Sequence, residues 1–127
     1  MSVRHKLLVV DDSNLIRLRI TRVLMDSRDS SWNIVGLAPN GVEAVKFCKN
    51  LAPTVATLDI TMPEMDGVTC VTELLKVDPN LRILIVSALS DKATALQALK
   101  RGAHGFLYKP FTDLELLTAL REVVEEE

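Results

Sequence analysis

Five short runs of apolar or β-branched residues recur along the chain, and a segment with helical apolar spacing follows each. The runs lie at 7–10 (LLVV), 34–37 (IVGL), 55–58 (VATL), 83–86 (ILIV) and 106–108 (FLY). Most are continuous rather than alternating, which indicates strands that are covered on both faces, as in a parallel sheet. Strands that alternate with helices predict a parallel sheet with helices on both faces and right-handed crossovers.

The helices between the predicted strands are indicated by apolar stripes and by start signals. The stripes are Ile16, Ile20, Val23 and Leu24; Ala44, Val45 and Cys48; Val71, Leu74 and Leu75; Ala95, Leu96 and Leu99; and Leu116, Leu117, Leu120 and Val124. Asn40 and Thr112 each precede a glutamate by three residues, the spacing of a capping box. Asp66 and Ser90 are further expected N-caps.

Length and composition restrict the class of protein. The 127 residues suit one domain, and 48% hydrophobic with 25% charged residues excludes intrinsic disorder. A net charge of −2 and only 4% aromatic residues argue against direct nucleic-acid binding. No apolar stretch approaches the roughly 20 residues that a membrane span needs, so no membrane insertion is expected.

The two cysteines and the N-terminal run point to one compartment. Cys48 and Cys70 form no CxxC pair, and we expect free thiols rather than a disulfide. The short apolar run at 7–10 ends in two acids and lacks the features of a signal peptide. We therefore expect a cytoplasmic protein.

Polar side chains follow four of the five predicted strands. Asp11 and Asp12 follow the first strand, Asp59 the third, Ser87 the fourth and Lys109 the fifth. Ligands of parallel α/β sheets bind at the carboxyl ends of the strands, so these side chains are expected to share a cleft.

The residue types indicate the chemistry of this cleft. Three adjacent carboxylates repel one another unless a cation lies between them, and Mg²⁺ is the cation that suits oxygen ligands and phosphate partners. A carboxylate can be a nucleophile that forms an aspartyl phosphate. Lys109 and Mg²⁺ could offset the charge of a transferred phosphoryl group, and the hydroxyl of Ser87 could donate a hydrogen bond. The set predicts a magnesium-dependent phosphoryl acceptor.

Four segments carry a resemblance to a known family. LLVVDDS at 7–13, LDITMPEMDG at 58–67, IVSA at 85–88 and FLYKPF at 106–111 occur in the order and spacing of receiver domains of two-component response regulators. The chain most closely resembles the CheY-like single-domain type. The resemblance implies a flavodoxin-like, doubly wound (βα)5 fold, with a five-stranded parallel sheet of order 2-1-3-4-5, and one receiver domain over residues 1–127.

The family's functional residues map onto this chain one by one. The resemblance makes Asp59 the phosphoacceptor, and it makes Asp11, Asp12, Asp59 and the backbone carbonyl of Thr61 the Mg²⁺ ligands. Lys109 matches the lysine that contacts the phosphoryl oxygens. A protein of this kind catalyses only its own phosphorylation and dephosphorylation and is not a metabolic enzyme.

The resemblance also implies a switch. The hydroxyl of Ser87 moves toward the phosphoryl group, and the aromatic ring at Phe106 swings into the vacated space. This biases the face made of the fourth helix, fifth strand and fifth helix (α4-β5-α5 in the family) toward a partner. The implied partners are a histidine kinase as phosphodonor, a downstream target such as a flagellar motor switch component, and a phosphatase.

Two positions, 106 and 89, depart from the family pattern. The family pattern also predicts the conformation of one peptide bond. Phe106 stands where chemotaxis regulators commonly have Tyr, which removes a hydroxyl contact with the partner. Leu89 cannot orient an attacking water, so we expect slow self-dephosphorylation. The bond before Pro110 is expected to be cis.

Three alternatives remain beside this hypothesis. The chain could be the receiver half of a longer response regulator with a DNA-binding or other output domain. A haloacid-dehalogenase-type phosphatase would need a second acid two residues after the nucleophile, where this chain has Thr61. A flavodoxin-like flavin carrier would need a phosphate loop after the first strand, where Asp11 and Asp12 would repel the flavin phosphate.

Overall fold

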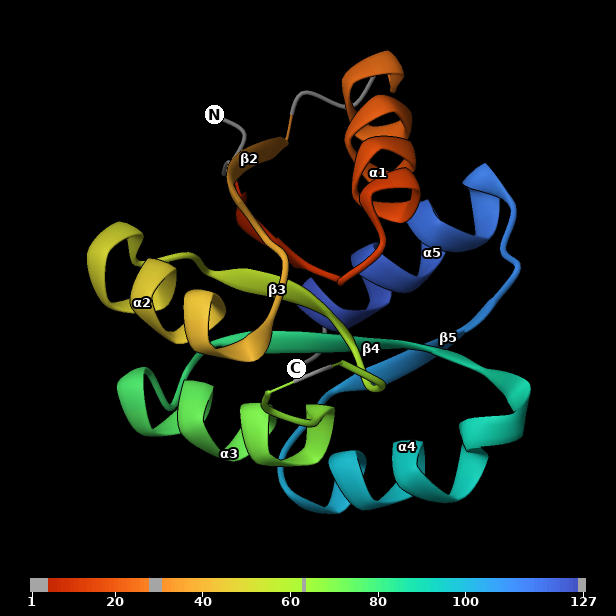
Figure 1. Cartoon of the computed structure of the whole chain (residues 1–127). Coiled ribbons are helices and arrows are strands. Elements are labelled where there is room, and N and C mark those ends of the chain that lie inside the picture. The colour runs from red at the N-terminus through yellow and green to blue at the C-terminus, as the bar shows by residue number, and fades with distance from the viewer. Residues whose placement is uncertain (1–4, 28–30, 63, 126–127) are drawn as a thin grey trace.

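Five parallel strands form one twisted sheet in the computed structural model, which describes residues 5–27, 31–62 and 64–125 (Figure 1). The strands are β1 (His5–Val10), β2 (Trp32–Ala38), β3 (Val55–Asp59), β4 (Arg82–Ala88) and β5 (Gly105–Lys109). Their order in the sheet is β2-β1-β3-β4-β5, and every neighbouring pair is parallel. The predicted strands and their order are confirmed.

Helices cover both faces of this sheet. They are α1 (Asn14–Asp26), α2 (Gly41–Leu51), α3 (Gly67–Val77), α4 (Lys92–Lys100) and α5 (Asp113–Val124), and the short 3-10 helix η1 (Leu89–Asp91) precedes α4. Figure 1 shows α1 and α5 on one face and α2, α3 and α4 on the other. No helix in the described ranges is both long enough and apolar enough to cross a membrane.

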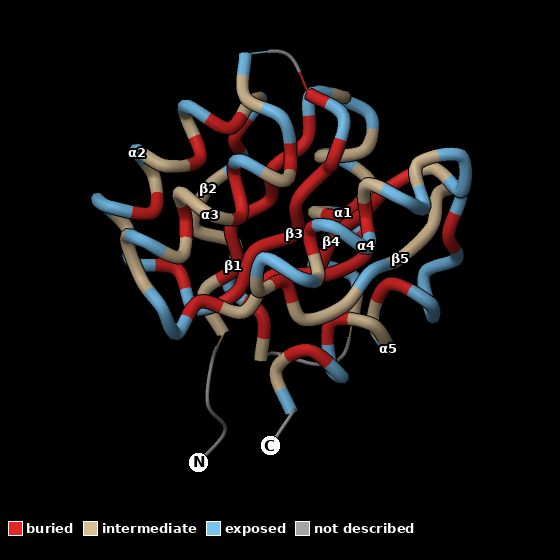
Figure 2. Tube along the Cα trace, turned by 90° about the horizontal axis from the view of Figure 1, so that it is seen from below, coloured by how far each residue is buried: buried red, intermediate tan, exposed pale blue. Residues whose placement is uncertain are grey.

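The strands separate two apolar cores. Side chains of β1 alternate between them, with Leu7 and Val9 packed on the α1 and α5 side and Leu8 and Val10 on the other. Burial is therefore continuous along the central strands, as Figure 2 shows for β1 and β3. This explains the continuous apolar runs, because a strand covered on both faces has no solvent-facing position to fill with polar residues.

The predicted apolar stripes match the buried helix faces with one exception. Leu96 is exposed, while Ala95 and Ala98 are buried. Residues three apart share a helix face, and position 96 lies about 100° away from position 95 around the helix axis. The assignment of Leu96 to the core was therefore wrong, because two alanines set the packing face of α4.

Side chains cap most of the helices where the sequence predicts it. Asn40 and Asp66 accept hydrogen bonds at the starts of α2 and α3, and Thr112 forms a complete capping box on α5. The prediction for Ser90 was wrong: this residue lies inside η1, and Asp91 occupies the cap position of α4. The tight 3-10 turn displaces the start of α4 along the chain.

The two cysteines are buried free thiols, as predicted. Cys48 lies on α2 and Cys70 on α3. Burial raises the pKa of the Cys70 thiol to about 12 and also raises the pKa of Cys48. Because the thiolate is the reactive form, both cysteines serve packing rather than chemistry.

Candidate functional site

Three carboxylates meet at the carboxyl ends of β1 and β3. Asp11 and Asp12 directly follow β1, and Asp59 is the last residue of β3. The register that pairs Val10 with Leu58 brings these strand ends side by side. One oxygen of each carboxylate lies within 4.8 Å of the others, with Asp11 and Asp59 buried and Asp12 exposed. The cluster predicted from the sequence therefore forms.

Lys109 reaches this cluster from the far side of β4. It is the last residue of β5, and its Nζ lies 3.1 Å from Oδ2 of Asp11 and 3.6 Å from Oδ1 of Asp59. The bond between Lys109 and Pro110 is cis, as predicted. One ammonium group thus lies against two buried carboxylates that come from two other strands.

Ser87 lies at the same edge of the sheet, near the end of β4. Its side chain is buried, and its Oγ has no hydrogen-bond partner among the residues that the structure describes. A buried hydroxyl without a partner costs about 1–3 kcal/mol, which is uncommon in a folded core. Such a hydroxyl is free to donate to an incoming acceptor oxygen.

Thr61 contacts the phosphoacceptor candidate through its backbone. Its N–H donates to Oδ1 of Asp59 at 3.3 Å, and its side-chain hydroxyl donates to Oδ2 of Asp91 at 3.2 Å. Sequence reasoning missed Asp91 because no local pattern distinguishes it from other acids at the start of a helix. The role of the Thr61 carbonyl stays a prediction.

Phe106 lies apart from the carboxylates, on β5. Its side chain is exposed, and its ring centre lies 5.1 Å from that of Tyr108. The structure therefore places the ring outside the core, beside residues of α5 that include Leu114 and Thr118. Its predicted inward movement is not tested by this arrangement.

The electrostatics of the cluster are unfavourable for three ionised acids. Burial, and after it the charge of Asp11, raise the pKa of Asp59 to about 7, although Lys109 and the Thr61 N–H act in the opposite direction. Oxygen-only donors in this arrangement fit a hard divalent cation such as Mg²⁺, whose charge would relieve the repulsion. Lys109 supplies one positive charge for three clustered acids, two of them buried, so a divalent cation would offset the remaining negative charge.

A close backbone contact holds the loop that follows Asp59. A Cβ atom at Gly67 would lie 2.5 Å from Cα of Ile60, and the Gly67 N–H donates to the Ile60 carbonyl at 2.9 Å. Only glycine permits this approach. The Asp66–Gly67 pair of the LDITMPEMDG segment thus both caps α3 and fixes the loop at the site.

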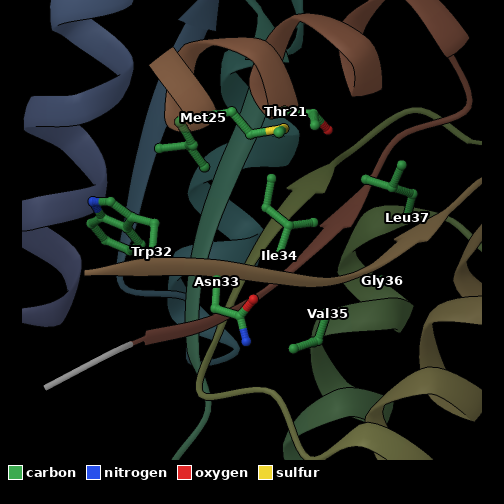
Figure 3. A pocket seen from close by; sticks show the side chains of 9 residues that line it. Thr21, Met25, Trp32, Asn33, Ile34, Val35, Gly36 and Leu37 are labelled. Atoms are coloured by element: carbon green, nitrogen blue, oxygen red, sulfur yellow. The ribbon is translucent and has the colours of Figure 1, made fainter. Parts of the chain in front are cut away.

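A separate cavity of about 480 Å³ lies between α1 and the edge strand β2 (Figure 3). Met25 and Ile34 face each other across it, whereas Asn33 and Val35 point away on the opposite side of β2. None of the predicted site residues lines this cavity. The chemistry that the sequence predicts therefore belongs to the strand ends and not to this cavity.

Comparisons with known proteins agree with this geometry. The family of response regulator receiver domains matches residues 7–121. The chemotaxis protein CheY of Thermotoga maritima is 37% identical over 118 residues, which cover 93% of this chain and 96% of that protein. A protein-glutamate methylesterase/protein-glutamine glutaminase 2 of Photobacterium profundum is 44% identical over 110 residues, but these cover only 27% of its length against 86% of this chain.

A solved structure extends the likeness to three dimensions. The CheX-CheY-BeF3-Mg complex of Borrelia burgdorferi contains a chain that superimposes with a TM-score of 0.88 at 32% identity. The match covers 98% of this chain and 92% of that one. Because the family match spans nearly the whole chain and CheY relatives align along their whole length, this protein belongs to the response regulator receiver domain family.

Proposed function

We propose that this protein is a chemotaxis-type signalling switch that accepts a phosphoryl group from a histidine kinase on Asp59. The observation that carries the proposal is the pair of contacts from Lys109 Nζ, 3.6 Å to Asp59 and 3.1 Å to Asp11. A carboxylate at a strand end is common, but one that is buried beside a second acid and a lysine is suited to phosphoryl transfer.

The transfer itself is a displacement at phosphorus. The phosphorus–nitrogen bond of a phosphohistidine breaks while a bond forms between phosphorus and a carboxylate oxygen of Asp59. The imidazole leaves with the electron pair of the broken bond and takes up a proton. Lys109 stabilises the negative charge on the transferred group. Its ammonium group already lies near Asp59 and can donate hydrogen bonds to the phosphoryl oxygens.

Asp11, Asp12, Asp59 and the carbonyl of Thr61 would hold the Mg²⁺ ion. Bound there, the ion supplies positive charge that neutralises the carboxylates and the phosphoryl oxygens. The exposed position of Asp12 leaves one side of the cluster open to solvent. An open side suits an ion that keeps several of its water ligands.

The output would come from the face formed by α4, β5 and α5. The unpartnered hydroxyl of Ser87 can donate to a phosphoryl oxygen, and its movement toward that oxygen would vacate space for the Phe106 ring. Exposed Phe106, Leu96 and Lys92 give this face apolar and cationic groups for a partner. A flagellar motor switch component is the downstream partner we propose, and a phosphatase is a further one.

A second candidate is the same receiver within a longer regulator. The methylesterase relative supports it, because the matched segment is only 27% of that protein. We favour the first candidate, in which residues 1–127 form a single receiver domain. We propose that it acts in the cytoplasm and does not bind nucleic acid directly. The full-length alignment with CheY supports that choice.

The test is incubation with acetyl phosphate and Mg²⁺, followed by intact mass measurement. We expect one phosphoryl adduct on the wild-type protein and none on Asp59→Asn, which keeps the size of the side chain. An equal adduct on both proteins, or steady hydrolysis of many phosphomonoesters, would contradict the proposal. Co-purification with flagellar switch components would then separate the chemotaxis role from that of a longer regulator.

A further inference from the structure

Thr61 forms a bridge between two carboxylates that lie on different loops. Its backbone N–H donates to Oδ1 of Asp59 at 3.3 Å, and its hydroxyl donates to Oδ2 of Asp91 at 3.2 Å. Asp59 ends β3, whereas Asp91 ends η1 and directly precedes α4. One residue therefore connects the phosphoacceptor with the start of a helix on the output face.

Asp91 occupies the N-cap position of α4 without capping it. Its φ and ψ angles are −100° and 22°, and its side chain accepts no hydrogen bond from the first turn of α4. Side chains of Ser13, Asn40, Asp66 and Thr112 cap the other four α-helices of the described chain. Aspartate is among the best capping residues, so rotation of the Asp91 backbone into the extended region that the other four caps adopt would give its carboxylate a second favourable partner.

We propose that Asp91 has two alternative partners, the hydroxyl of Thr61 and the first-turn N–H groups of α4, and that phosphorylation of Asp59 moves it from the first to the second. This inference rests on the proposed function and adds to it a specific route from the site to α4. It assigns a switching role to Asp91, which is not among the predicted site residues.

Charge supplies the driving force for this exchange. The phosphoryl group carries about −1.5 to −2 charges at neutral pH, whereas the free carboxyl group of Asp59 carries at most −1, so phosphorylation makes this position more negative. Thr61 links the carboxylate of Asp91 to that of Asp59 through two hydrogen bonds, so the added negative charge repels the Asp91 carboxylate. The N-terminus of α4 carries partial positive charge and attracts the same carboxylate. The bond that must break is exposed to solvent, and such a bond contributes little net stability.

The first experiment needs no phosphorylation. Amide hydrogen exchange of the first turn of α4, residues 92–95, is measured in EDTA for the wild type and for Thr61→Val. Valine keeps the β-branched shape and the backbone N–H but cannot hold Asp91. We expect exchange in this turn to slow about 3- to 10-fold, which corresponds to one hydrogen bond gained at the cap.

Two further variants make the result specific. Thr69→Val removes a matched exposed contact, the 3.3 Å hydrogen bond from Thr69 to Asp66, and is expected to leave α4 exchange at the wild-type rate. In the double variant Thr61→Val/Asp91→Ala, the α4 amides are expected to exchange without the slowing seen in Thr61→Val. No slowing in Thr61→Val, or slowing that persists in the double variant, overturns the proposal.

The second experiment adds acetyl phosphate and Mg²⁺. In wild-type protein whose phosphoryl adduct is verified by mass, exchange at residues 92–95 is expected to slow to the rate of unphosphorylated Thr61→Val. An adduct without slowing overturns the switch while the proposed function stands. If no adduct forms, the proposed function fails, and the EDTA experiment alone decides whether Asp91 exchanges partners.

Discussion

Lys109 lies 3.6 Å from Asp59 and 3.1 Å from Asp11, so one ammonium group faces two buried carboxylates. The closer contact is with Asp11. Burial and the charge of Asp11 outweigh the effect of Lys109 on Asp59, whose pKa is raised to about 7. Without a cation, the native protein therefore resists ionisation of the residue on which its function is proposed to depend.

Asp59→Asn is expected to stabilise the metal-free protein, and more so at high pH. The native pKa of Asp59 is raised to about 7 from an ordinary value of 3.8. Wild-type stability therefore falls as pH rises from about 4 to 7, because the unfolded carboxyl ionises first, and the full penalty persists above 7. We expect a gain on the order of 2 kcal/mol or more at pH 8 and a smaller one at pH 5.

Urea unfolding in EDTA at both pH values measures this difference. Asp26→Asn is the matched control, since Asp26 is an exposed acid at the end of α1. A stability gain for Asp59→Asn that is equal at pH 5 and pH 8 would show that ionisation of Asp59 is not its cause.

Mg²⁺ is expected to raise the melting temperature of the wild type and to do so less in Asp12→Asn. At ten times its dissociation constant, a ligand that binds only the folded state stabilises it by about 1.4 kcal/mol. Asp12 is exposed, so its replacement leaves the core intact while removing one carboxylate of the cluster. Calorimetry with and without Mg²⁺ measures this change in melting temperature. An equal increase in the wild type and in Asp12→Asn would show that Asp12 is not a Mg²⁺ ligand.

Gly67→Ala is expected to destabilise the fold and to slow phosphorylation. The new Cβ would lie 2.5 Å from Cα of Ile60, and backbone atoms cannot move aside as a side-chain end can. Overpacking of this kind costs about 1–3 kcal/mol. Because Ile60 lies between Asp59 and Thr61, the displacement would also distort the site.

Gly36→Ala serves as the comparison for this prediction. Its Cβ would meet the end of the Leu8 side chain at 3.1 Å, which can shift slightly. Chemical denaturation and the rate of adduct formation with acetyl phosphate measure both effects. If the Gly67→Ala protein is as stable and as reactive as the Gly36→Ala protein, the role assigned to the contact between Gly67 and Ile60 is refuted.

Leu89→Glu is expected to shorten the lifetime of the phosphorylated protein. The Leu89 side chain is 64% exposed in η1 and has no group that can orient a water molecule. A carboxylate there could hold a water for attack on phosphorus, at little cost to folding. Intact mass followed over time gives the half-life, with Leu89→Met as an apolar control. A half-life that is unchanged or longer in Leu89→Glu would contradict the expected slow self-dephosphorylation.

Most of the fold could be predicted because its signals are local. The five apolar runs lie inside the observed strands, and Asn40, Asp66 and Thr112 cap helices as their spacing predicts. The two errors, Ser90 and Leu96, both concern α4. Its start depends on a 3-10 turn and its inner face on two alanines, neither of which has a strong sequence signature.

The sequence by itself determined the element order and the strand-end acids Asp11, Asp12 and Asp59, because parallel strands bring their carboxyl ends to one edge. Only the tertiary structure decided that Thr61 joins Asp59 to Asp91, which lies 30 residues further along the chain than Thr61. It also decided that Gly67 approaches the backbone of Ile60. Such contacts depend on how loops pack after the sheet has formed, and residue periodicity carries no information about that packing.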